Sequence, residues 1–265
     1  MNRTERAKLL SGMVAAAAEA GARIHAMAAA GLVARSKADK SPVTDADEAA
    51  EKIIEERLTA LLPDAPMIGE ETVAGGRKTN TGGMFFLVDP IDGTREFIAK
   101  RNEYTVNIAL LIDGTPALGV IYAPALAELY AGGADGAYRM ALAPGADVAS
   151  ALPQKIQVRA APKNVVAAVS HSHLDAATLA WLKQRAITET MKLGSSIKFV
   201  RVAEGKVDVY PRLAPVSEWD IAAGHAILMA AGGSVKAPDG RPLLYGKRKD
   251  GYLVESFIAS SGSSF

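Results

Sequence analysis

Hydrophobic residues near the start of the chain recur at the spacing of an α-helix. They form one stripe made of Leu10, Met13, Val14, Ala17, Gly21, Ile24 and Ala28. A stripe with this period predicts an amphipathic helix, and Gly31 suits its end. A second helix is predicted to begin near Thr44 and to stop before Pro63, since proline cannot continue a helix. The polar residues 35–42 between the two helices predict a loop.

The pattern changes at Met84, where an apolar run to Val88 predicts a short buried strand. Further strands are predicted at residues 104–112, 118–122 and 128–131. Residues 140–153 are rich in Ala, Gly and Pro and are the best candidate for a boundary. Strand and helix patterns then alternate, with strands at 156–158, 165–170, 188–193 and 207–210 and helices at 174–185, 195–204 and 221–231. The chain is therefore predicted to form an α+β half, residues 1–150, packed against a smaller α/β half, residues 151–265.

The composition excludes several kinds of protein. Hydrophobic residues make up 49% of the chain and the formal net charge is +1. Because no dense cluster of Lys and Arg is present, a long nucleic acid is not an expected partner. The sequence has no cysteine, which excludes disulfides, thiolate metal sites and cysteine nucleophiles. The cytoplasm is the expected location. No apolar run is long enough to span a membrane, so only peripheral contact with the cytoplasmic side of the inner membrane stays open.

The segment Asp89-Pro-Ile-Asp-Gly-Thr94 directly follows the predicted buried strand. Its proline and glycine force the backbone to turn, so that Asp89 and Asp92 can converge on one point with the carbonyl oxygen of Ile91. Two carboxylates and a carbonyl, completed by water, suit a hard cation such as Mg²⁺. Thr94 then opens a stretch of helix-compatible composition whose first N–H groups could face a phosphate. The alternative is a turn residue followed by an ordinary helix cap.

Three further acidic positions have an ordinary explanation when each is taken singly. Glu70 and Glu71, at a predicted strand end, could be solvated loop charges. Asp47 could close a capping box with Thr44. Asp220 could complement the dipole at the start of a helix.

Taken together, these acids resemble the metal-ligand pattern of the inositol monophosphatase superfamily in order and in context. The matching strings are Pro42-Val-Thr-Asp-Ala-Asp47, Gly69-Glu70-Glu71, Asp89 to Thr94, and Trp219-Asp220-Ile-Ala-Ala-Gly224. A chance match to all four strings in the correct order is not a serious competitor. The resemblance implies a layered α-β-α-β-α fold and metal-assisted hydrolysis of a phosphate monoester. Residues 77–83 and 139–153 match the family only loosely.

The resemblance also implies a role for each matched position. The implied ligands are Glu70, Asp89 and the Ile91 carbonyl for a first metal ion, and Asp89, Asp92 and Asp220 for a second. A third, weaker cation near Glu70 is similar to what the family shows, which gives two to three Mg²⁺ ions. Thr94 resembles the residue that helps to activate the attacking water, and either Asp47 or Glu70 would polarise it. Inhibition by lithium is implied too, and calcium is expected to inhibit because its coordination is less strict than that of Mg²⁺.

Further strings resemble the 3′(2′),5′-bisphosphate nucleotidase branch of the superfamily. They are Lys40-Ser-Pro-Val-Thr44, Arg95-Glu-Phe-Ile98, Arg101-Asn102, and residues 104–109, 194–199, 202–205 and 210–212. An inositol phosphatase would more usually carry a Thr-Asn-Phe-type string in place of Arg95-Glu96-Phe97. The branch implies removal of the 3′-phosphate from adenosine 3′,5′-bisphosphate, a by-product of sulfate assimilation, to leave AMP.

A second anion site is suggested by Gly194-Ser195-Ser196, which precedes a helical stretch carrying Lys198. Arg212 could add a guanidinium, although the glycine and serines could equally form an ordinary helix cap. His171 and His173 suit polar surface or substrate contact. The implied substrate contacts are Glu70, Ile91, Asp92, Gly93, Thr94, His173, Gly194, Ser195, Ser196, Lys198, Arg212 and Asp220.

Two other functions stay open at this point. One is an inositol or other sugar monophosphatase of the same superfamily, and the other is a non-catalytic metal-binding scaffold that acts through protein contacts. The complete set of acids and phosphate-site candidates argues against the scaffold. The expected partner is a small phosphorylated nucleotide, and the sequence leaves a monomer and a homodimer equally open.

Overall fold

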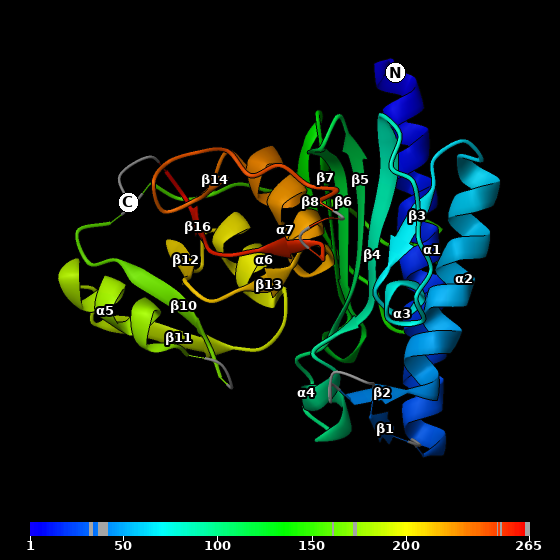
Figure 1. Cartoon of the computed structure of the whole chain (residues 1–265), viewed down its shortest axis with the longest axis horizontal. Helices are drawn as coiled ribbons and strands as arrows, with labels where there is room; N and C mark the ends of the chain where they lie inside the picture. The colour runs from blue at the N-terminus through cyan, green and yellow to red at the C-terminus, as the bar shows by residue number, and fades with distance from the viewer. Residues whose placement is uncertain are drawn as a thin grey trace.

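The protein, seen in a computed structural model, is built of five layers in the order α-β-α-β-α, which Figure 1 shows edge-on. The structure describes residues 1–31, 34–36, 42–160, 162–171, 174–247, 249 and 251–262. In these residues the α-helices are α1 (Arg3–Ala30), α2 (Asp45–Leu61), α3 (Glu70–Ala74), α4 (Thr94–Ile98), α5 (Ala176–Gln184), α6 (Ile197–Ala203) and α7 (Glu218–Ala230). The layered architecture implied by the family resemblance is confirmed.

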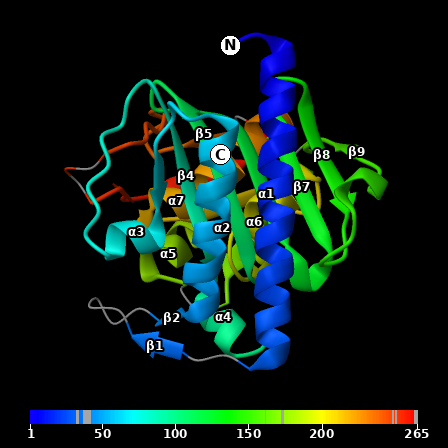
Figure 2. The same ribbon diagram turned by 90° about the vertical axis from the view of Figure 1, so that its right-hand side faces the viewer.

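Helices α1 and α2 lie side by side and form the outer layer (Figure 2). Both predicted helices are confirmed, and Gly31 ends α1 with a φ of 101°. At the start of α2, the Thr44 side chain accepts a hydrogen bond from the N–H of Ala46, and Asp47 accepts one from the N–H of Thr44. The capping box predicted from the sequence therefore forms.

The first sheet holds seven strands of the described chain in the order β3-β4-β5-β6-β7-β8-β9. They are β3 (Met67–Gly69), β4 (Met84–Asp92), β5 (Thr105–Ile112), β6 (Thr115–Ala123), β7 (Glu128–Gly133), β8 (Gly136–Ala141) and β9 (Gln154–Ile156). Only β3 and β4 pair in parallel among these, and the others pair antiparallel. Both faces of the sheet are covered: in β4, Phe86 and Val88 pack toward α1 and α2, whereas Phe85 and Leu87 pack toward α7. This two-sided burial explains the uninterrupted apolar run in the sequence.

Two features of the first half differ from the sequence prediction. Residues Ala34–Ser36 (β1) pair antiparallel with Pro42–Thr44 (β2), so the predicted loop has paired ends, while residues 37–41 lie outside the described part. Strand β9 pairs with β8, so the last strand of the first sheet lies after residue 150. The division into halves at residue 150 remains a prediction, and the two large sheets separate between Ile156 and Val166.

The second sheet has five strands of the described residues in the order β11-β10-β12-β16-β14. They are β10 (Val166–Ser170), β11 (Glu189–Leu193), β12 (Val209–Arg212), β14 (Ser234–Lys236) and β16 (Phe257–Ser260). A small antiparallel pair, β13 (Val216–Ser217) with β15 (Leu253–Val254), lies beside it, and two 3₁₀ turns occur at Pro124–Leu126 and Val148–Ser150. Helix α5 covers the outer face through Trp181 and Leu182.

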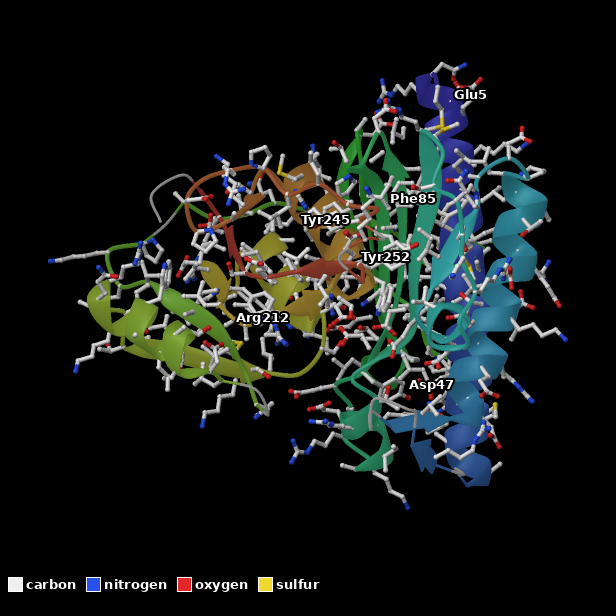
Figure 3. The ribbon with its side chains drawn as sticks, viewed as in Figure 1. Glu5, Asp47, Phe85, Arg212, Tyr245 and Tyr252 are labelled. Carbon is white, nitrogen blue, oxygen red and sulfur yellow. The ribbon has the colours of Figure 1, made fainter. Side chains whose placement is uncertain are left out.

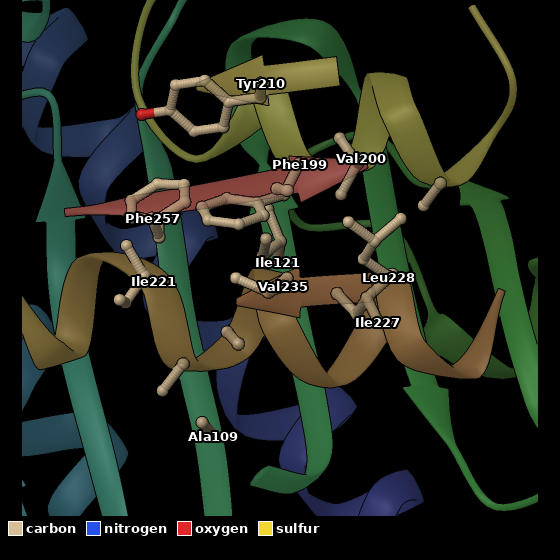
Figure 4. Close-up of a cluster of buried hydrophobic side chains, with 14 of the residues drawn as sticks. Ala109, Ile121, Phe199, Val200, Tyr210, Ile221, Ile227, Leu228, Val235 and Phe257 are labelled. Carbon is tan, nitrogen blue, oxygen red and sulfur yellow. The ribbon is translucent and has the colours of Figure 1, made fainter. Parts of the chain in front are cut away.

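Helices α6 and α7 fill the layer between the two sheets. Phe199 of α6 is stacked on Phe257 of β16, and the centroids of the two rings are 5.3 Å apart. Figure 4 shows this pair, together with apolar side chains of α7 packed against the first sheet. The two helices approach closely because Gly224 has no side chain: a Cβ there would lie 2.4 Å from the Phe199 ring. None of the helices in the described residues is both long and apolar enough to cross a membrane.

Candidate metal and phosphate site

Three carboxylates from distant parts of the chain meet at one point. Glu70, Asp89 and Asp220 each offer an oxygen, and these oxygens lie within 4.8 Å of one another. We call these three residues the acidic cluster. All the donors are hard oxygen atoms, which are the ligands that Mg²⁺ prefers, so the residues present fit a magnesium site.

The parallel pairing of β3 and β4 explains why Glu70 and Asp89 are neighbours. In the register of the two strands Gly69 lies opposite Val88. The residue that follows each of them, Glu70 and Asp89, therefore emerges at the same end of the strand pair. Asp220 reaches this edge from the first turn of α7, which packs across β4. The acidic cluster is thus a product of strand register and of one helix crossing.

Burial and mutual repulsion make the acidic cluster unfavourable as three free anions. The pKa of Asp89 is raised well above its usual range, chiefly by burial and then by the charges of Glu70 and Asp92. Burial also raises the pKa of Asp220, with Asp92 and Glu70 adding to the effect. A divalent cation at this point would offset the repulsion, since an ion is the largest local charge in such a site.

Asp92 lies at the end of β4, after an irregularity that shifts the register between Asp89 and Asp92. Its Oδ2 accepts a hydrogen bond of 2.5 Å from the backbone N–H of Ser196 and a longer one of 3.4 Å from Asn107 Nδ2. Burial raises the pKa of Asp92, and the charge of Lys198 opposes this. The carboxylate is therefore fixed in place by groups from both halves of the molecule.

Thr94 is the first residue of α4, after Gly93, whose φ of 92° suits a residue without a side chain. Its hydroxyl lies 3.0 Å from the Ile91 carbonyl oxygen and 3.3 Å from Asp47 Oδ1. The other oxygen of Asp47 accepts two hydrogen bonds from Thr44, at 2.7 Å and 2.6 Å. In the structure Asp47 closes the capping box and also contacts Thr94, while its part in activating water stays a prediction.

The Gly194-Ser195-Ser196 segment is bound to the first half. Ser195 has a φ of 53°, and its hydroxyl lies 2.6 Å from that of Thr105. The Ser196 hydroxyl donates to Asn107 Oδ1 at 2.7 Å, and the N–H of Gly194 donates to a carboxylate oxygen of Glu103 at 2.9 Å. These contacts hold the start of α6 against the edge of the first sheet.

Two basic side chains lie on the same side of the site. Lys198 is buried, and its ammonium donates to the Ser195 carbonyl and lies 5.2 Å from the centre of the Tyr210 ring. Burial, helped by the charge of Arg212, lowers the pKa of Lys198 to about 8. Arg212 donates from Nη2 to the Pro215 carbonyl at 3.2 Å, but its buried Nε has no hydrogen-bond partner in the described residues. Figure 3 shows Arg212 on β12 and Asp47 at the start of α2, on opposite sides of the site.

Most of these groups line a cleft of about 540 Å³. Of the predicted site residues, those lining the cleft are Glu70, Asp89, Ile91, Asp92, Gly93, Thr94, Ser195, Ser196, Lys198, Arg212 and Asp220. Asp47 lies behind Thr94, and Gly194 lies against Glu103. His173 falls outside the described residues.

The structure adds cleft residues to which the sequence analysis gave no role. Ser170, Arg95, Glu96, Tyr210, Ser217 and Leu253 also line the cleft. Asn107 contacts both Asp92 and Ser196, yet it entered the sequence analysis only as part of a matching string. The position of Ser170 at the end of a strand beside the two histidines was the one local signal that could have marked it.

Comparisons with known proteins agree on one family. The model of the inositol monophosphatase family matches residues 5–261. The 3′(2′),5′-bisphosphate nucleotidase CysQ of Escherichia coli (strain K12) is 42% identical over 225 residues, which cover 85% of this chain and 87% of the relative. The crystal structure of CysQ from Bacteroides thetaiotaomicron, a bacterial member of the inositol monophosphatase family, has 34% identity and a TM-score of 0.79, covering 96% of this chain and 97% of that one. An inositol monophosphatase from Anabaena (Nostoc) sp. PCC 7120 has 27% identity and a TM-score of 0.74, covering 96% and 90%.

Proposed function

Because the chain belongs to the inositol monophosphatase family, we propose that it is a Mg²⁺-dependent 3′(2′),5′-bisphosphate nucleotidase. It hydrolyses the 3′-phosphate of adenosine 3′,5′-bisphosphate to give AMP and inorganic phosphate. One observation carries the proposal: the acidic cluster and the cations of Lys198 and Arg212 line the same cleft. Such a cleft suits a substrate with one phosphate at the metal ions and a second negative group nearby.

The neighbouring carboxylate oxygens of Glu70, Asp89 and Asp220 support a shared cation site. By the family resemblance, Glu70, Asp89 and the Ile91 carbonyl would hold a first Mg²⁺ ion, Asp89, Asp92 and Asp220 a second, and a weaker third cation would bind near Glu70. When bound, Mg²⁺ lowers the pKa of water and offsets the charge that develops on the phosphate oxygens. The contact of Ser196 and Asn107 with Asp92 keeps this ligand oriented, as partners of metal ligands commonly do.

Thr94 and Asp47 form the proton-accepting part of the site. As the Thr94 oxygen accepts a proton from an attacking water, its hydroxyl can pass its own proton to Asp47 Oδ1, so that the proton ends on the Asp47 carboxylate. Asp47 is buried and is held by Thr44, so it is aimed at Thr94 before a substrate arrives. Between the two carboxylates weighed from the sequence, this contact favours Asp47 as the partner of Thr94.

The basic side of the cleft accounts for the choice of substrate. The unpaired buried Nε of Arg212 needs an acceptor, because an unsatisfied buried donor is costly. A second phosphate provides acceptor oxygens for the guanidinium and for the Lys198 ammonium together. An inositol monophosphate has no second phosphate, so it leaves both cations without this partner. We place the enzyme in the cytoplasm, since a chain without cysteine suits a reducing compartment.

A substrate panel tests the proposal. Phosphate release from adenosine 3′,5′-bisphosphate and from inositol 1-phosphate is measured with Mg²⁺ and again with excess chelator. We expect the nucleotide to be preferred by about tenfold or more in kcat/KM, roughly the effect of one or two charge-assisted hydrogen bonds, and chelation to abolish both reactions. A tenfold preference for the inositol ester would assign the chain to the other branch of the family. No phosphate release from these two esters or from any other phosphate monoester would leave only a metal-binding scaffold.

A further inference from the structure

A buried glutamate on α2 contacts the helix that carries Glu70. Glu51 lies one helical turn after Asp47, on the same buried side of α2. Its Oε2 accepts a hydrogen bond of 2.8 Å from the N–H of Glu71, and its Oε1 accepts one of 2.8 Å from the N–H of Thr72. Both oxygens of one carboxylate thus bind consecutive backbone groups of α3.

These two N–H groups belong to the first turn of α3, where a helix has no internal acceptors for them. A side chain at the N-cap position usually supplies the acceptor, but the N-cap of α3 is Gly69, which has none. Glu51 therefore caps α3 from another helix. Its negative charge also lies at the positive end of the short helix.

Glu51 can approach the start of α3 because Gly69 has no side chain. A Cβ at this position would lie 2.4 Å from Glu51 Oε2, which is closer than such atoms can approach. Any other residue at position 69 would have to displace the carboxylate or the start of α3. Glu51 and Gly69 are thus sterically matched.

The capped turn carries a member of the acidic cluster. Glu70 is the first residue of α3 and lies between Gly69 and Glu71. The N–H of Glu71 donates to Glu51, and the Gly69 backbone lies directly against the Glu51 carboxylate. The direction of the Glu70 side chain depends on the orientation of this turn, because α3 has only five residues, of which Val73 packs against the hydrophobic core. Among the residues of α3, the structure describes none that is buried.

We propose that Glu51 is a positioning residue for the cation site: by capping α3 it fixes the carboxylate of Glu70 beside those of Asp89 and Asp220. The inference rests on the proposed function, since it assumes that the acidic cluster binds a divalent cation. The first two turns of α2 then serve the site twice, through the contact of Asp47 with Thr94 and through the cap that Glu51 forms on the turn carrying Glu70. Replacing partners of metal ligands typically weakens metal binding or activity by about 10- to 100-fold.

The test compares Glu51→Gln with Glu56→Gln, a control with the same chemical change at an exposed position of the same helix. A glutamine offers one acceptor oxygen and turns an NH₂ group toward a backbone N–H, so one of the two caps is lost. Binding of Mn²⁺, used as a probe for the site, is measured by calorimetry on the full chain, and the Mg²⁺ dependence of phosphate release is measured beside it. We expect Glu51→Gln to bind Mn²⁺ about tenfold or more weakly and to need correspondingly more Mg²⁺, while the control matches the wild type.

A second substitution keeps the test decisive if Glu51→Gln does not fold. Gly69→Ala leaves the carboxylate present but displaces it, and it should weaken Mn²⁺ binding in the same way. In a Glu51→Ala background the added methyl group meets no carboxylate, so Gly69→Ala should then have little further effect on Mn²⁺ binding. Wild-type Mn²⁺ affinity in a folded Glu51→Gln or Gly69→Ala protein would overturn the inference while leaving the nucleotidase proposal intact. A wild-type chain that neither binds Mn²⁺ nor releases phosphate would overturn the proposed function itself.

Discussion

The backbone N–H of Ser196 lies 2.5 Å from Asp92 Oδ2, although 104 positions separate the two residues in the chain. The contact joins the start of α6 to the end of β4, and the neighbouring Ser196 hydroxyl reinforces it through Asn107. A residue proposed as a metal ligand is therefore held by the half of the molecule that also carries Lys198 and Arg212. The proposed cation site and the proposed substrate site are therefore linked by the hydrogen bond between Asp92 and Ser196.

Asp89→Asn should abolish turnover and leave the fold intact. Asp89 is the buried carboxylate that the two proposed ions share, and an amide brings no charge to either of them. Phosphate release with saturating Mg²⁺ should fall by more than about 100-fold, because loss of a residue that only hydrogen-bonds a metal ligand already costs up to about 100-fold. The circular dichroism spectrum should be unchanged. The matched control is Asp113→Asn, in an exposed turn where φ is 49° and asparagine is well tolerated. Near-normal activity of the Asp89 variant would refute the ligand assignment.

Thr94→Val should lower kcat much more than it raises KM. Valine keeps the shape of threonine but removes the hydroxyl that lies between Ile91 and Asp47. Loss of a positioned proton-transfer group typically costs about 10²- to 10⁴-fold in rate. Steady-state kinetics of Thr94→Ser, which restores the hydroxyl, provide the control and should return most of the activity. Equal kcat in the valine variant and the wild type would exclude Thr94 from the proton path.

Arg212→Gln should reduce the preference for a doubly phosphorylated substrate. The guanidinium is expected to contact the second phosphate, so adenosine 3′-monophosphate, which lacks it, should be affected much less. We expect kcat/KM for adenosine 3′,5′-bisphosphate to fall by roughly 10- to 100-fold, the worth of one charge-assisted hydrogen bond. Arg241→Gln, at an exposed ion pair with Asp239, is the control. An equal loss for both nucleotides would place Arg212 outside the second phosphate site.

His225→Gln should make the protein less sensitive to acid. Burial lowers the pKa of His225 to about 4, and its Nδ1 lies 2.8 Å from the Tyr245 hydroxyl. Below pH 6.5 the unfolded chain takes up a proton at this position and the folded chain does not, so the free energy of unfolding decreases as the pH falls toward 4. Between pH 7 and pH 5 the histidine accounts for a loss of about 2 kcal/mol.

Urea unfolding at pH 7 and at pH 5 measures this contribution. The decrease in unfolding free energy should be smaller by about 2 kcal/mol in His225→Gln than in the wild type. His25→Gln, at an exposed position of α1, should behave as the wild type does. The same pH dependence in all three proteins would show that His225 titrates normally.

Local patterns in the sequence were sufficient for much of the fold. The period of α1, the capping box at Thr44 and the apolar run of β4 each depend on neighbouring residues, and the structure has all three. Strand β8 escaped prediction because its residues are mixed in character, although it pairs with the preceding strand β7. Strands β14, β15 and β16 escaped prediction because they are short and pair with segments remote in the sequence. The short β9 directly follows the segment where composition suggested a boundary, yet its pairing with Ala137, Tyr138 and Arg139 makes it part of the first sheet.

The turn pattern singled out Asp89 and Asp92, and the family resemblance added Glu70 and Asp220, but neither pointed to the groups that hold these acids. Asp89 and Asp92 stand out because two acids flank a turn after a buried strand. Glu51 looks like one more acid on a charged helix, and its role appears only when α3 is packed against α2. The serines at 195 and 196 could be taken as a helix cap until the first sheet supplied Thr105 and Asn107 as their partners.

The seating of α7 has a consequence for how such proteins can diversify. A Cβ at Gly119 would lie 2.4 Å from the Ala223 carbonyl oxygen, and one at Gly132 would lie 2.7 Å from the Cα of Ile227, so the helix rests directly on the backbone of β6 and β7. Asp220, although encoded late in the chain, is thereby mounted on the same rigid support as Glu70 and Asp89. Insertions or substitutions in the second sheet and in α5 can then change which ester is accepted without moving the acidic cluster.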